Sequence, residues 1–198
     1  MLNPAAEIAP DWRRRWSLLL DKIERVQSDA QGQALLVELS TPRAPTVLAF
    51  ANAHAMNSMA VSAPFFEAMH SADRVLRDGS GMATLFKLLR MEPGLNLNGT
   101  DLIPKLIRAF DGRGIALFGT REPWLEKAGQ RVHEELAPHS PLISANGFLD
   151  AGNYSLLATA HRPALIVLGM PRRPVGLPPR AAHGQPRRNR AGGYRPHC

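Results

Sequence analysis

Apolar residues in this chain follow two alternating patterns. Short, nearly continuous apolar runs, such as GIALFGT at 114–120 and ALIVLGM at 164–170, are typical of buried strands. Between them lie segments in which apolar residues recur every three or four positions, the spacing of one helix face. The pattern predicts helices over 10–28, 62–72, 82–91, 100–110, 122–137 and 155–162, and strands over 34–40, 46–52, 74–76, 114–120, 141–147 and 164–170.

Several of the predicted strands are apolar along their whole length rather than at every second residue. This pattern is typical of parallel strands that helices cover on both faces. The sequence therefore predicts the α/β fold class, with a Rossmann-like, mostly parallel sheet covered by helices on both faces. We expect an N-terminal amphipathic helix region over 1–29, an α/β domain over 30–171 and a basic Arg/Pro-rich tail over 172–198.

The net charge of +7 comes from the tail. Of the 24 Lys and Arg residues, seven Arg lie in 172–198, and the other 17 are balanced by 17 Asp and Glu residues in the rest of the chain. A neutral body without a recognition motif argues against specific nucleic-acid binding. Nonspecific polyanion binding through the tail is kept as an alternative function.

The sequence also bears on the cellular compartment. No apolar run approaches the ~18 residues of a membrane span, and the N-terminus lacks the apolar core of a signal peptide. Cys198 is the one cysteine, so no intrachain disulfide is expected. We expect a cytoplasmic protein. Trp12 and Trp16, with three Arg between them, fit either a helix packed on the core or a face at a membrane surface.

Residues 172–198 follow neither apolar pattern. They are rich in Arg, Pro and Gly, and they begin directly after a predicted strand and its turn. Two explanations stay open. The segment is a disordered basic tail, or it is the out-of-frame translation of a GC-rich gene.

The turn Asp78-Gly79-Ser80-Gly81 lies where a predicted strand passes into a helix. In open α/β sheets, ligands bind outside the carboxyl ends of the strands. Asp78 could cap the helix, accept a proton or bind a metal, and the two glycines would let backbone amides approach an anion. The turn matches neither the Walker loop nor the dinucleotide fingerprint.

Other predicted strand ends carry similar turns. Gly119 and Gly147 follow strands, and Thr100 or Asp101 is a candidate cap of the helix over 100–110. The histidines are scattered, without the paired spacing of a metal site. We therefore expect no metal.

Six short motifs follow one another along the chain. They are Asn52, Asp78-Gly79-Ser80-Gly81, Gly99-Thr100-Asp101-Leu102, Leu117-Phe118-Gly119, Asn146-Gly147-Phe148 and Leu168-Gly169-Met170-Pro171. Their order and spacing resemble those of the WecG/TagA/CpsF glycosyltransferase family, over about residues 30–171.

The resemblance implies an inverting transfer of a sugar from a UDP-sugar, of the N-acetylmannosamine or uronic-acid type, to a polyprenyl-diphosphate-linked saccharide. The implied setting is surface polysaccharide synthesis at the inner face of the cytoplasmic membrane. No cofactor is implied beyond the donor, and self-association is left open. Asp78 would be the general base, and Asn52 would position a substrate. The implied nucleotide- or substrate-binding residues are Gly79, Gly81, Asp101, Gly119, Asn146, Gly147, Phe148, Gly169, Met170 and Pro171.

The resemblance breaks off after Pro171. The family continues with Lys-Gln-Glu, a further strand and helix, and a C-terminal appendage, whereas this chain continues with Arg172-Arg173-Pro174. Two other differences are Phe50, where members often have Thr, and Asn96, where they have Arg. These departures favour a truncated or frameshifted end, and they leave an inactive relic of the family as the first alternative function.

Overall fold

All strand pairings in residues 11–169, which the computed structural model describes, are parallel. This confirms the predicted α/β class. The strands form two three-stranded sheets rather than one continuous sheet. The first has the order β1 (Ile23–Glu24), β3 (Arg74–Arg77), β2 (Leu48–Ala51), and the second has the order β5 (Leu142–Ala145), β4 (Ile115–Gly119), β6 (Leu165–Gly169).

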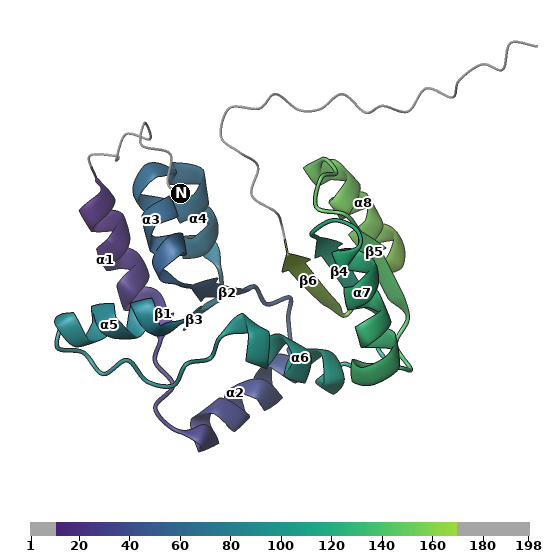
Figure 1. Ribbon diagram of the computed structural model, residues 1–198, viewed down its shortest axis with the longest axis horizontal. Coiled ribbons are helices and arrows are strands. Elements are labelled where there is room, and N and C mark those ends of the chain that lie inside the picture. The colour runs from purple at the N-terminus through teal and green to yellow at the C-terminus, as the bar shows by residue number, and fades with distance from the viewer. Residues whose placement is uncertain (1–10, 170–198) are drawn as a thin grey trace, which may run out of the picture.

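Helices separate the strands and surround both sheets (Figure 1). A π-helical segment, Val132–Leu136, directly follows the seventh helix. The helices are α1 (Trp12–Lys22), α2 (Asp29–Ser40), α3 (Ala53–Val61), α4 (Ala63–Ser71), α5 (Ser80–Leu88), α6 (Gly99–Ala109), α7 (Trp124–Arg131) and α8 (Ala151–His161).

The first sheet buries both of its faces, as its apolar strands predict. Ala51 and Val75 belong to a core that α1, α3, α4 and α5 cover, with Leu19, Met56, Phe66 and Phe86 among its members. On the opposite face, Leu48, Phe50 and Leu76 pack against leucines of α2 and α6. Successive strand residues thus point to opposite cores, which explains why the strands lack alternation of apolar and polar residues.

The second sheet is also covered on both sides of its central strand. Ile115 and Leu117 of β4 pack on one face with α7 and the end of α6, and Ala116 and Phe118 pack on the other face with α8. The edge strand β6 is less completely covered, because Ile166 and Leu168 remain 42% and 65% exposed.

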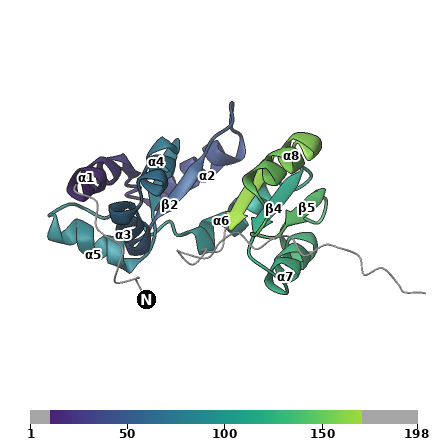
Figure 2. The ribbon, with the colours of Figure 1, turned by 90° about the horizontal axis from the view of Figure 1, so that it is seen from above.

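Helix α6 connects the two sheets, and it lies between them in Figure 2. Leu102 and Leu106 belong to the core of the first sheet, whereas Ile107 and the following Phe110 belong to the core of the second. A further link comes from Arg113, whose Nη1 donates to the Ser40 carbonyl at 2.8 Å.

The predicted strand over 34–40 is wrong, because these residues form the C-terminal part of α2. The helix begins after Ser28, whose hydroxyl accepts the Gln31 amide at 3.3 Å. Leu35, Leu36 and Leu39 then face the first sheet at helical spacing. A continuous apolar run does not distinguish a buried strand from a buried helix, and the cap upstream decides here.

Two further elements differ from the prediction. The helix expected over 10–28 ends at Lys22, and Ile23 and Glu24 pair instead with Val75 and Leu76. The helix α3, which the sequence did not predict, begins directly after β2. The side chain of Asn52 caps it by accepting the Ala55 amide at 2.9 Å.

The predicted outcome of Gly119→Ala is a loss of about 3 kcal/mol of stability. Gly119 has φ +137°, and an added Cβ would lie 2.3 Å from the carbonyl carbon and oxygen of Gly169, so β4 and β6 would have to separate. For a chain of this size the loss corresponds to a fall in Tm of roughly 6–12 °C in calorimetry. The control is Gly152→Ala in α8, where nothing lies within 4 Å of the added atom. An equal Tm for both variants would contradict the prediction.

Candidate active site

Asn52 and Asp78 come together at the carboxyl ends of two neighbouring strands. The parallel register of β2 and β3 pairs Ala51 with Arg77, so the next residue of each strand lies at the same edge. The Asp78 amide donates to the Ala51 carbonyl at 2.9 Å, and Asn52 Nδ2 lies 3.5 Å from Asp78 Oδ2. The structure therefore places a carboxamide beside a carboxylate, both half-buried, at the position expected for a ligand site.

Gly79 and Gly81 allow the turn after Asp78 to lie close against its neighbours. Gly79 is the N-cap of α5 with φ +85°, a conformation that favours glycine. A Cβ on Gly81 would lie 3.0 Å from Cβ of Ala53, the first residue of α3. No side chain caps α5, which begins at Ser80, two residues after Asp78. A helix N-terminus of this kind attracts anions.

Two residues outside the predicted site hold this turn. Asn96 Oδ1 accepts the Gly79 amide at 2.8 Å. The buried guanidinium of Arg77 donates to the carbonyl of Gly79 and to the carbonyls of Pro93 and Gly94, at 2.9–3.0 Å. The Gly79 amide is thus already paired and is not the group that would contact a phosphate.

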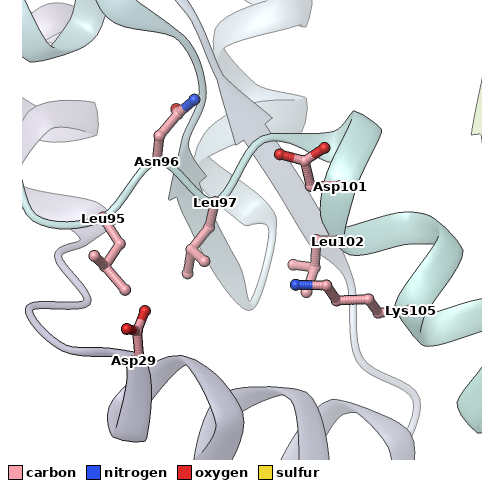
Figure 3. A pocket seen from close by; sticks show the side chains of 7 residues that line it. All are labelled: Asp29, Leu95, Asn96, Leu97, Asp101, Leu102 and Lys105. Atoms are coloured by element: carbon pink, nitrogen blue, oxygen red, sulfur yellow. The ribbon is translucent and has the colours of Figure 1, made fainter.

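Asp101 lies in the first turn of α6, and the helix cap is Asn98 rather than Thr100 or Asp101. Asn98 Oδ1 accepts the Asp101 amide at 2.8 Å, and Asn98 Nδ2 donates to Asp101 Oδ2 at 2.9 Å. Asp101 lines an open pocket of about 220 Å³ between α2 and α6. Figure 3 shows its lining side chains, which are Asp29, Leu95, Asn96, Leu97, Asp101, Leu102 and Lys105.

The predicted residues of the second sheet gather at its own carboxyl edge. Thr120 follows Gly119 and connects two neighbours, because its amide donates to the Gly169 carbonyl and its carbonyl accepts the Gly147 amide, both at 2.8 Å. The Asn146 side chain accepts the Phe148 amide at 3.1 Å. Phe148 itself is 51% exposed. Gly119, Asn146, Gly147, Phe148 and Gly169 thus form a second group.

The predicted site is therefore divided between the two sheets. One group consists of Asn52, Asp78, Gly79 and Gly81. Asp101 lines the pocket that Asn96 also lines, and Asn96 binds the Gly79 amide. The residues around Thr120 form the other group. Within residues 11–169, no hydrogen bond joins the two groups. Met170, Pro171 and the predicted tail over 172–198 lie outside the described residues.

Within residues 11–169, no three His, Cys, Asp or Glu side chains cluster so that they could hold a metal ion. Every helix in this part of the chain is too short or too polar to cross a bilayer.

Comparison with protein families identifies the class of enzyme. A parallel α/β fold with a carboxylate and glycine turns at its strand ends is an arrangement that suits transfer of a group from a nucleotide-activated donor. The model of the "Glycosyl transferase WecG/TagA/CpsF family" matches residues 17–173, so this chain belongs to that family of glycosyltransferases. No individual curated protein matches the chain. The resemblance inferred from the strand-end motifs is thereby confirmed.

Arg77 and Asn98 are the functional candidates that sequence reasoning missed. Arg77 lies directly after the strand predicted over 74–76, whereas in the structure it is the buried last residue of β3, where a charge requires partners. Asn98 stands directly before Gly99-Thr100-Asp101 and has the residue type of a helix cap. Asn96 was noted only as a difference from the family.

We expect Asn52→Ala to remove about 1 kcal/mol of stability, because it deletes the cap of α3. Ser62→Ala is the matched control, since the Ser62 hydroxyl caps α4 by accepting the Phe65 amide at 3.3 Å and has no contact with Asp78. Urea unfolding should give similar losses for the two variants. A much larger loss in Asn52→Ala would show that the contact with Asp78 also contributes to folding.

Proposed function

We propose that this chain is an inverting glycosyltransferase of cell-surface polysaccharide synthesis. It moves a sugar from a UDP-sugar to a saccharide linked to polyprenyl diphosphate, at the inner face of the cytoplasmic membrane. Family membership supports the transfer of a sugar from a donor to an acceptor. The observation that carries the chemical assignment is the pairing of Asn52 with Asp78 beside the uncapped start of α5.

In the proposed reaction, Asp78 is the general base. An acceptor hydroxyl attacks the anomeric carbon of the donor and loses its proton to the Asp78 carboxylate. The new carbon–oxygen bond forms as the bond from the anomeric carbon to the phosphate oxygen breaks, and the electron pair leaves with UDP. A carboxylate within hydrogen-bond reach of the hydroxyl accelerates such a step by about 10²–10⁴-fold.

Asn52 has a positioning role in this scheme. Its Oδ1 is fixed by the Ala55 amide, which directs Nδ2 toward Asp78 Oδ2. This side chain orients the carboxylate and lies where it can also contact a bound substrate hydroxyl. The oxygen assigned to the base therefore lies beside a carboxamide whose own position is fixed by a backbone amide.

The departing diphosphate requires positive potential, because negative charge develops on it as the bond breaks. The first turn of α5, after Gly79, supplies backbone amides and the positive end of a helix dipole. No step in this proposal requires a metal ion. The second group, around Gly119, Asn146, Gly147, Phe148 and Gly169, is assigned to the nucleotide.

The test uses the full chain, UDP-N-acetylmannosamine as donor and a short-chain polyprenyl-diphosphate saccharide as acceptor. Asp78→Asn should lower kcat by about 10²–10⁴-fold and leave the Kd of UDP, measured by calorimetry, within about threefold, because the base acts on the acceptor. Asp21→Asn is the control, since Asp21 is an exposed carboxylate on α1 that forms no hydrogen bond with Asn52 or Asp78.

The outcomes separate the alternatives. Undiminished transfer by Asp78→Asn would remove Asp78 from the mechanism. UDP binding by the wild-type chain without transfer of any sugar would favour the inactive relic. Binding to polyanions alone, without UDP affinity, would favour the role of the basic tail.

A further inference from the structure

Arg77 is a buried cation to which the proposed reaction, as described so far, assigns no role. Its exposed fraction is 5%, and it is the one charged residue among the buried residues of the described chain. Within residues 11–169, no carboxylate forms an ion pair with it. Burial lowers the pKa of Arg77, which reflects the cost of removing the guanidinium from water. The nearby charge of Asp78 offsets only part of this cost, so a buried guanidinium without an ion pair calls for a reason.

The hydrogen bonds of Arg77 show what it does locally. Its three nitrogens donate to three backbone carbonyls: Nε to Pro93 at 2.9 Å, Nη2 to Gly94 at 2.9 Å and Nη1 to Gly79 at 3.0 Å. Because the guanidinium is planar and rigid, three such bonds fix the relative positions of the groups that accept them. Arg77 thereby ties the turn after β3 to the 93–94 segment, which precedes α6.

The loop that contains Pro93 and Gly94 also binds the backbone amide of Gly79. The Gly79 amide donates to Asn96 Oδ1 at 2.8 Å, so both its peptide groups are bonded to residues 93–96 or to Arg77. The loop in turn is fixed against the end of β1, where the Leu95 amide donates to the Val26 carbonyl at 2.7 Å. The residue enclosed between Arg77 and Gly79 is Asp78.

We propose that Arg77 is a positioning residue, which sets the orientation of Asp78 and the start of α5 through its fork of hydrogen bonds to Gly79, Pro93 and Gly94. This inference rests on the proposed function, because it assigns Asp78 as the base. The role belongs to the geometry of the guanidinium rather than to its charge. A displacement of a reacting group by about 1 Å costs on the order of 10²-fold in rate.

Arg74 provides a matched control on the same strand. It lies at the opposite end of β3 and forms ion pairs with Glu24 and Glu38. Burial disfavours its charged form, but the hydrogen bonds and charges of the two carboxylates outweigh burial and raise the pKa of Arg74. Arg74→Met thus removes an Arg and its bonds from β3 without touching the turn that holds Asp78.

The experiment compares Arg77→Lys, Arg77→Met and Arg74→Met in the full chain. Lys keeps the charge but lacks the planar fork, so both Arg77 variants should lose about 10²-fold in kcat, with the KM of UDP-N-acetylmannosamine within about threefold of the wild-type value. Arg74→Met should retain kcat within about threefold. Amide hydrogen exchange should accelerate over 77–81 and 93–98 in the Arg77 variants alone.

Three results would each overturn the inference. They are a kcat of Arg77→Lys near the wild-type value, an equal loss of kcat in Arg74→Met, and unchanged exchange over both segments in the Arg77 variants. If Arg77→Met does not fold, Arg77→Lys decides the question. If the wild-type chain transfers no sugar, the proposed function fails, and hydrogen exchange still decides whether Arg77 holds the turn.

Discussion

The burial of β3 on both faces and both edges is the constraint on which the rest of the first sheet depends. Val75 and Leu76 point into opposite cores, and β1 and β2 pair with the strand on either side. Its direction and register are fixed by these contacts. The chain leaving β3 can only emerge beside the chain leaving β2, and this is why Asp78 meets Asn52 although 26 positions separate them in the sequence.

The parts of the fold that the sequence predicted are those in which local pattern and burial agree. The strands predicted over 46–52, 74–76, 114–120, 141–147 and 164–170 are present. Four of them are shorter than predicted, and β3 extends one residue further, to Arg77. Apart from the exposed Ile166 and Leu168 of β6, the large apolar residues of the observed strands are buried or partly buried, which is the environment that the pattern predicts. The segment over 34–40 failed because the same composition also suits a helix packed on one face of a sheet. The division into two sheets depends on pairing, which carries no local signal.

The candidate site was predicted in part for a related reason. Asp78, Gly79 and Gly81 were candidates because they lie at a strand end and because their turn is one of the motifs whose order and spacing resemble the family. The adjacency of Asn52 and Asp78 follows from the register of β2 and β3, which a single sequence does not reveal. Arg77 bonds to backbone carbonyls 16 and 17 residues further along the chain. Every residue has a backbone carbonyl, so hydrogen bonds to these carbonyls produce no recognisable pattern in the sequence.

The position of α6 has a consequence for how the protein folds. Adjacent residues of this one helix, Leu106 and Ile107, complete the cores of different sheets. Neither sheet can lose its packing without exposing a helix that the other sheet needs. We therefore expect the two halves to unfold cooperatively, so that packing in the second sheet also protects the edge where Asp78 lies from local opening.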